Sequence, residues 1–145
     1  MENRNGLIVD IDVSRADGRA ERESATRMLK RRKSSKRVTL GADKGYDTKD
    51  FVAACRETKV TPHVAQNIYG NRKSAIDGRT TSKAGYKVSQ VCRRGIEKIF
   101  GWLKTIGDWE KTRFRGLERV TLGAYLAAAA FNLMRIGRLA TPAAA

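Results

Sequence analysis

A chain of 145 residues, 41% of them hydrophobic, has room for one domain with a modest core, and this composition argues against disorder throughout. The 30 Lys and Arg residues against 15 Asp and Glu residues give a formal net charge of +15, which predicts a polyanionic partner, most simply nucleic acid. Cys55 and Cys92 form no C-x-x-C pattern, and a histidine-based zinc site or a Ser-His-Asp triad would depend on His63 alone, for which a structural role is favoured.

The first predicted elements are a turn and a strand. Asn5 and Gly6 form a dipeptide that strongly indicates a hairpin turn, and residues 7–13 are rich in Ile and Val, as strands are. So short a stretch before the turn implies a missing partner strand, and we therefore expect the sequence to begin inside a domain. A helix is predicted over residues 20–32, and a basic surface loop follows it.

A second strand is predicted over residues 37–41, and Asp43 follows directly after it. Because open α/β sheets bind their ligands at the carboxyl ends of strands, Asp43 is a candidate ligand-binding residue. Asp47 and Thr48 are typical of a helix start, and that helix is predicted over residues 48–58. The alternative is a plain strand-to-helix turn with a capping Asp, which accounts for Asp47 but poorly for Asp43.

A strand over residues 60–65 comes next, and Pro62 predicts that it lies at a sheet edge. Residues 67–87 are too polar for a core and too long for a tight connection, so a mobile basic loop is predicted there. Contact with DNA and an insertion without function both remain open for this loop. Its candidate DNA-binding residues are Arg72, Lys73, Arg79 and Lys83.

A helix with two stripes is predicted over residues 90–104. At roughly 100° per residue, one flank is apolar. Its members are Cys92, Ile96, Ile99, Leu103 and Ile106. The adjoining flank carries Arg93, Glu97 and Lys104, which places one carboxylate between two cations at the edge of a core. The simpler alternative is a solvated face with an ordinary i,i+4 pair of Arg93 and Glu97.

Residues 109–116 alternate between basic and aromatic side chains. We predict an edge segment that packs Trp109 and Phe114 and turns its cations outward, and Arg113 and Arg115 are the candidate DNA-binding residues among them. A long helix is predicted over residues 117–139, followed by a disordered tail over residues 140–145.

The longest uncharged run, residues 120–134, is too short for a membrane span. No signal peptide is visible, so we expect no membrane partner. Both cysteines are expected to be buried thiols in a reducing cytosol.

Two of these stretches together resemble the catalytic core of bacterial insertion-sequence DDE transposases. Residues 42–47, Ala-Asp-Lys-Gly-Tyr-Asp, match the turn that holds the family's second Asp. The family's acidic helix carries a Tyr-x2-Arg-x3-Glu-x6-Lys signature, which this sequence supplies as Arg93, Glu97 and Lys104. Gln90 stands in the position of the tyrosine, so no role of a tyrosine hydroxyl carries over to this chain.

The likeness runs from about Asn3 to Arg138 and includes the Phe-Gly-Trp-Leu run at 100–103 and the Arg-Gly pair at 115–116. It implies an α/β chain with a partial ribonuclease H-like fold, a mixed sheet with flanking helices that lacks its first strands. Residues 1–139 would then be the C-terminal part of a DDE catalytic domain.

The resemblance also implies a chemistry, DNA cleavage and strand transfer with two Mg²⁺ or Mn²⁺ ions. Asp43 and Glu97 would be catalytic and metal-binding residues, and Arg93 and Lys104 would contact DNA. The family's first Asp would lie upstream of the hairpin. Asp10 or Asp12 could take its place, but the order of strand, helix and Asp43 strand favours an upstream position.

The leading hypothesis is therefore a segment of a DDE transposase that binds element ends and target DNA. The expected state is a homo-oligomer or a mixed oligomer with full-length transposase, in the bacterial cytoplasm and associated with the nucleoid through DNA. The alternative is a non-catalytic DNA-binding remnant that inhibits full-length transposase. A ribosomal or nucleoid protein would share the charge but would have no reason for isolated carboxylates at Asp43 and Glu97.

Overall fold

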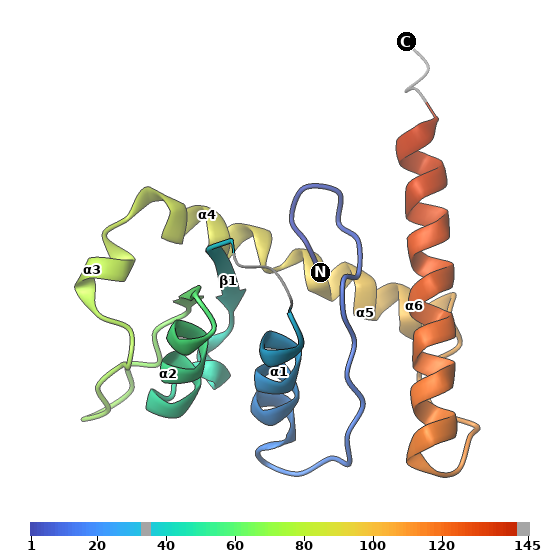
Figure 1. Cartoon of the computed structure of the whole chain (residues 1–145), viewed down its shortest axis with the longest axis horizontal. Helices are drawn as coiled ribbons and strands as arrows, with labels where there is room; N and C mark the ends of the chain where they lie inside the picture. The colour runs from blue at the N-terminus through green and yellow to red at the C-terminus, as the bar shows by residue number, and fades with distance from the viewer. Residues whose placement is uncertain (33–35, 142–145) are drawn as a thin grey trace. The chain divides into compact units, whose positions relative to one another are not determined.

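The structure is a computed structural model that describes residues 1–32 and 36–141 (Figure 1). Contacts along the chain divide it into two units. The sheet unit is Asp17–Arg94, and the helical unit combines Met1–Ala16 with Gly95–Ala145. The family turn at residues 42–47 therefore belongs to the sheet unit. The predicted tail lies outside the described residues from position 142 onward.

The sheet unit is built on two parallel strands, β1 (Val38–Ala42) and β2 (Val60–Val64), joined through helix α2 (Lys49–Glu57). Val38 pairs with Val60, and the register continues to Ala42 and Val64. Both strands and the helix lie where the sequence predicted them. Among the described residues these strands are the whole sheet, so it is smaller than the mixed sheet predicted.

The core of the sheet unit forms where α2 meets the strands. Its buried members are Phe51, Val52, Cys55, Val60, Val64 and Ile76, and helix α1 (Ala20–Arg31) adds Ala25 and Leu29 at its margin. Leu40 and Ala42 of β1 face this cluster. Burial raises the pKa of the Cys55 thiol to about 12, as expected for a buried structural cysteine. Cys92 is only half-buried.

The other face of the strands is covered by helix α4 (Ala84–Cys92). Gly41 alternates with the core-facing residues of β1, and a Cβ atom built on it would lie 3.0 Å from the Ser89 carbonyl oxygen and 3.2 Å from Arg93 Cβ. The absence of a side chain at Gly41 therefore lets α4 approach the sheet closely.

The segment predicted as a mobile basic loop contains regular structure and a core residue. Helix α3 (Gly78–Thr81) begins at Asp77, whose side chain accepts a hydrogen bond from the Thr80 N–H, and α4 occupies the end of the segment. Ile76 is only 2% exposed, and Gln66 Nε2 donates to its carbonyl oxygen at 2.9 Å. The expectation that the segment is too polar for a core is wrong at Ile76, while its mobility stays a prediction.

The helix predicted over residues 90–104 is two helices. Helix α4 ends at Cys92, and helix α5 (Gly95–Thr105) begins three residues later. Between them the Arg94 N–H donates to the Val91 carbonyl oxygen, an i,i+3 bond that tightens the chain before a glycine with poor helix propensity. The break is also the boundary between the two units.

Helix α5 contributes Ile99 and Leu103 to the interior of the helical unit, and helix α6 (Leu117–Ala140) contributes Ala124 and Ala128. As predicted, Trp109 and Phe114 pack together, and their ring centroids are 6.3 Å apart. Both rings lie against α6 at Gly123, where a Cβ atom would come within 2.6 Å of the Trp109 ring and 3.0 Å of Phe114.

The predicted turn at Asn5 and Gly6 is present, but the strand after it is not. Gly6 has φ +72°, and the Glu2 N–H donates to the Leu7 carbonyl oxygen at 2.9 Å. Residues 7–13 form no strand, so the prediction of a strand over these residues is wrong.

Side chains take the place of a partner strand for this segment. Asn132 on α6 accepts from the Ile8 N–H and donates to the Ile8 carbonyl oxygen, both at 2.8 Å. Arg135 Nε adds a bond to the Asn5 carbonyl oxygen at 2.7 Å. The main chain is therefore satisfied at these points without a ladder.

Helix α6 is 24 residues long and carries exposed apolar side chains along much of its length. In the part of the chain that the structure describes, it is the one helix whose length and composition would allow it to cross a membrane. Only 17% of its most apolar window is buried. Two of the polar side chains of α6, Asn132 and Arg135, form hydrogen bonds to the N-terminal segment.

Candidate functional site

Asp43 lies at the carboxyl end of β1, as the sequence predicted. Its Oδ1 accepts a hydrogen bond from the Gly45 N–H at 2.8 Å and so caps the short 3-10 helix η1 (Lys44–Tyr46). A Cβ atom on Gly45 would lie 3.0 Å from that oxygen, which explains the glycine in the turn. Asp43 is exposed, and Oδ2 has no hydrogen-bond partner among the described residues.

Asp47, the second acid of the turn, is 2% exposed and ties the turn to the segment that follows β2. Its Oδ2 accepts from the Asn67 N–H at 2.7 Å, and its Oδ1 accepts from the Ala75 N–H at 2.8 Å. Burial works to raise the pKa of this carboxyl, but these bonds and one from Ser74 outweigh burial and lower the pKa below its ordinary value. Asp47 is therefore a charged structural anchor.

Sequence reasoning missed this anchor because it treated Asp47 as part of a helix start. The helix cap is Thr48, whose side chain accepts from the Phe51 N–H at 3.4 Å. One local signal was available. In the sequence Asp47 lies between two aromatic residues, Tyr46 and Phe51, and a carboxylate that is buried among apolar neighbours needs fixed hydrogen-bond donors.

Gln90 and Arg93 lie near the strand residues that face away from the core of the sheet unit. Arg93 Cβ would lie 3.2 Å from a Cβ atom built on Gly41. Gln90 Nε2 donates to the His63 carbonyl oxygen at 2.6 Å, while its Oε1 accepts from Arg93 Nε at 2.9 Å. The residue that replaces the family's tyrosine thus bridges β2 and Arg93.

His63 takes part in packing, as the sequence predicted. It is 4% exposed, its Nδ1 lies 2.7 Å from Ser89 Oγ, and its ring meets Tyr86 edge-on at 5.7 Å. Burial lowers the pKa of His63, so the ring is neutral at pH 7. The Tyr86 hydroxyl also donates to the Val64 carbonyl oxygen at 2.9 Å, which gives α4 several polar links to β2.

Glu97 and Lys104 lie on α5, in its first and last turns, and both are exposed. Their spacing of seven residues puts them near one stripe of that helix, as predicted, and their charges suit the two ends of its dipole. Arg93 precedes this helix and belongs to the sheet unit. The signature residues Arg93, Glu97 and Lys104 therefore do not lie on one helix.

The other candidate DNA-binding residues are exposed cations on both units. Arg79 pairs with Asp77 at 2.9 Å, yet its side chain is 91% exposed. Arg72 donates to the Asp47 carbonyl oxygen at 3.0 Å, which fixes one end of its segment to the family turn. Arg113 forms an ion pair with Asp108. Lys73, Lys83 and Arg115 are exposed as well.

A metal ion was expected between Asp43 and Glu97. Within residues 1–32 and 36–141, no three His, Cys, Asp or Glu side chains gather in a set that could hold one. Asp43 offers one carboxylate oxygen without a hydrogen-bond partner in the described part of the chain, and Glu97 is exposed, so each is suited to donate to a hard cation. The two carboxylates on their own fall short of a ligand set.

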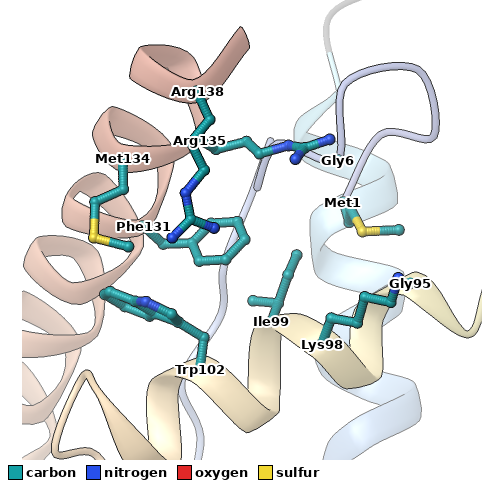
Figure 2. A pocket seen from close by; sticks show the side chains of 10 residues that line it. All are labelled: Met1, Gly6, Gly95, Lys98, Ile99, Trp102, Phe131, Met134, Arg135 and Arg138. Carbon is teal, nitrogen blue, oxygen red and sulfur yellow. The ribbon is translucent and has the colours of Figure 1, made fainter. Parts of the chain in front are cut away.

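The helical unit contains a pocket of about 200 Å³ between α5, α6 and the N-terminal segment (Figure 2). Trp102 and Phe131 form its aromatic wall with ring centroids 5.4 Å apart, and Lys98, Arg135 and Arg138 give it a basic rim. Trp102 Nε1 is buried there without a hydrogen-bond partner in the described chain. Neither Glu97 nor Lys104 lines this pocket.

A comparison with known families agrees with the turn and the signature. A family model described as Transposase DDE domain matches residues 1–133, well over half of the chain. No curated protein and no solved structure matches. Transposase function, with DNA as the partner, follows from the family match. The chain belongs to the transposase DDE domain family.

Proposed function

We propose that residues 1–139 act as the C-terminal part of a DDE catalytic domain with a ribonuclease H-like fold, which cuts DNA and joins the freed 3′ end to a target. The observation that carries this proposal is Asp43. Asp43 directly follows a parallel strand, is exposed and keeps one carboxylate oxygen free of hydrogen bonds to the described residues, in a chain matched by the family model over residues 1–133.

Asp43 and Glu97 are two of the metal-binding acids in this proposal. Divalent ions, when bound at such a centre, activate the attacking oxygen and neutralise the phosphate. The residues of this chain orient the substrate around that chemistry. Arg93 and Lys104 would offer cations to the phosphates, and a further acid must be supplied by a residue other than Asp43 and Glu97.

The exposed cations hold the DNA in place. Phosphate contacts position a duplex without reading its sequence, so binding rests on charge and is weakly specific. The segment over residues 67–87 suits this role because Asp47 and Ile76 fix it to the sheet unit while Arg79 and Lys83 stay in solvent.

Paramagnetic broadening by Mn²⁺ tests the two acids. Titration of the ¹⁵N-labelled chain with Mn²⁺ should broaden amide signals near Asp43 and near Glu97 first. Asp43→Asn and Glu97→Gln should each remove the effect at the changed position. Asp50→Asn, at an exposed acid in the first turn of α2, is the matched control and should leave both effects unchanged. Broadening that ignores both substitutions would contradict the assignment.

Cleavage of element-end DNA in Mg²⁺ or Mn²⁺ tests the reaction itself. The 145-residue chain should bind DNA without cutting it, whereas a protein that also carries the family's first strands and first Asp should cut, and Glu97→Gln should abolish that cutting. Binding without cutting by both proteins would favour the non-catalytic DNA-binding remnant. Nicking by this chain that Asp10→Asn or Asp12→Asn removes would place the first acid at one of those residues.

The salt dependence of DNA binding tests the basic segment. Replacing the four cations there with neutral residues should flatten the slope of log affinity against log salt concentration. These cations are Arg72, Lys73, Arg79 and Lys83. An unchanged slope would mean that this segment does not meet DNA.

A further inference from the structure

We infer that Gln90 is a positioning residue that holds the Arg93 guanidinium beside the Asp43 edge of the sheet, ready for a phosphodiester group of DNA. The inference rests on the proposed function for one point only, the contact of Arg93 with DNA. The hydrogen bonds on which it is built lie within the sheet unit, which contains Gln90 and both of its partners, His63 and Arg93.

The bridge uses both ends of the Gln90 amide. Its Nε2 donates to a main-chain oxygen, that of His63, which sits in register with Gly41 across the two strands. Its Oε1 accepts from Arg93 Nε at 2.9 Å. A main-chain partner on a strand moves little, so the amide is fixed at one end and restricts the arginine at the other.

The bridge leaves the two terminal nitrogens of the Arg93 guanidinium available for a ligand. Nε is the atom that Gln90 occupies, and the two terminal nitrogens of Arg93 have no hydrogen-bond partner among the described residues. Two parallel N–H donors on one planar group match two oxygens of a phosphate. Arg93 is half-buried, so its stem is packed against Gly41 while its outer end can meet a ligand.

Fixing the side chain in advance matters because a free arginine loses rotamer entropy when it binds. Each immobilised flexible side chain costs affinity, and a bond that is already made in the free protein removes part of that cost. A glutamine can serve at position 90 because its amide both donates and accepts, which the bridge between His63 and Arg93 requires.

A double-mutant cycle on DNA affinity tests the inference, measured by fluorescence anisotropy with the full chain at fixed salt. Gln90→Met keeps the length of the side chain and removes both hydrogen bonds. It should weaken binding by roughly 3- to 10-fold in the native background and have little effect when Arg93→Ala is already present. Equal losses in the two backgrounds would overturn the inference while leaving the proposed function intact.

Tyr86→Phe is the matched control. It removes another bond from α4 to β2, that of the Tyr86 hydroxyl to the Val64 carbonyl oxygen, and it does not touch Arg93. Its melting temperature should fall about as far as that of Gln90→Met, with DNA affinity unchanged. If Tyr86→Phe weakens DNA binding equally, the effect of Gln90 is one of stability and the inference fails.

The Arg93 Nε–H signal in NMR spectra of the free protein gives a readout that does not involve DNA. Its exchange with water should be slow in the native chain, fast in Gln90→Met and slow again in Gln90→Glu, which keeps the acceptor. A signal that Gln90→Met leaves unchanged would overturn the bridge. If the bridge is seen but Arg93→Ala binds DNA as well as the native chain, the proposed contact of Arg93 with DNA is wrong.

Discussion

The sheet unit and the helical unit bury their apolar residues to very different degrees. In the sheet unit, Cys55 and Val64 are 0% exposed, inside a buried cluster drawn from strand β2, helix α2 and Ile76. In the helical unit, Leu126 is 63% exposed and Leu133 is 71% exposed, although both lie in the one helix of the described chain whose length and composition would suit a membrane span. Apolar content alone therefore does not indicate where the core of this protein lies.

Periodicity explains the contrast. The apolar residues of α2 fall on one side, so that Phe51, Val52 and Cys55 all reach the strands. Those of α6 are spread around the helix, and the buried positions are the small residues Gly123, Ala124 and Ala128. Large apolar side chains on α6 such as Leu126 and Leu133 then remain in solvent. Asp43 and Arg93 thus belong to the unit with the larger buried apolar cluster, and Glu97 and Lys104 belong to the other unit.

The largest expected difference comes from truncating one apolar side chain in each unit. Phe51→Ala should lower the free energy of unfolding by about 3–5 kcal/mol, because it opens a cavity in the sheet unit. Leu126→Ala should change it by about 0.5 kcal/mol or less, because that side chain is already in solvent. Urea unfolding checks both, with β1 amide signals reporting the sheet unit and the two tryptophans, Trp102 and Trp109, reporting the helical unit. Similar losses of unfolding free energy in the two variants would contradict the difference in burial between the two units.

A polar anchor should matter nearly as much as the apolar core in the sheet unit. Asp47→Asn should cost about 3 kcal/mol, because an amide can accept only through one atom where the carboxylate now accepts from the main chain through both. Hydrogen exchange at Asn67 and Ala75 should speed up. Asp50→Asn, at an exposed acid of α2, should leave stability within about 0.5 kcal/mol. Equal effects at the two positions would contradict the anchoring role.

The same carboxylate predicts a dependence of stability on pH. The pKa of Asp47 is lower in the folded chain than its ordinary value, so its contribution is complete above the unfolded pKa of about 4 and is lost as pH falls through the folded pKa. The free energy of unfolding of the native chain should therefore fall below about pH 4. Asp47→Asn should flatten the plot of unfolding free energy against pH in this range. An unchanged plot would mean that other acids cause the loss of stability.

The smallest effects are expected from a matched pair of glycine substitutions on α6. Gly123→Ala should cost about 1–3 kcal/mol, because the new Cβ atom would meet the rings of Trp109 and Phe114. Gly137→Ala has nothing within 4 Å and should gain about 0.5–1 kcal/mol from helix propensity alone. Thermal melting followed by tryptophan fluorescence checks both. A neutral Gly123→Ala would mean that the helical unit is packed more loosely than its contacts indicate.

Local patterns in the sequence predicted β1, β2, α1, α2 and α6, because alternation, capping and apolar spacing act over a few residues. Two features depend on distant partners and could not be read in this way. Asp47 takes its donors from residues 67–75, and residues 7–13 use α6 in place of a strand. The break before Gly95 ends a stripe that looked continuous.

In the candidate site, too, features set by local sequence could be predicted and those set by distant contacts could not. The position of Asp43 at the end of β1 was predictable, since it needs only a strand and the turn that follows. The bridge from His63 through Gln90 to Arg93 was not, because it joins residues 27 positions apart through a main-chain oxygen. Placing Arg93, Glu97 and Lys104 on one helix was wrong, because Arg93 lies on the other side of the break.

The clamp that Asn132 places on Ile8 recognises only main-chain atoms, and this sets which positions can vary. In a deep mutational scan scored by protein abundance, Asn132 should tolerate few replacements, because no other side chain offers a donor and an acceptor in the same geometry. Ile8 should accept many side chains, since any residue except proline presents the same N–H and carbonyl groups. Substitution tolerance in the helical unit would then follow main-chain contacts more closely than hydrophobicity.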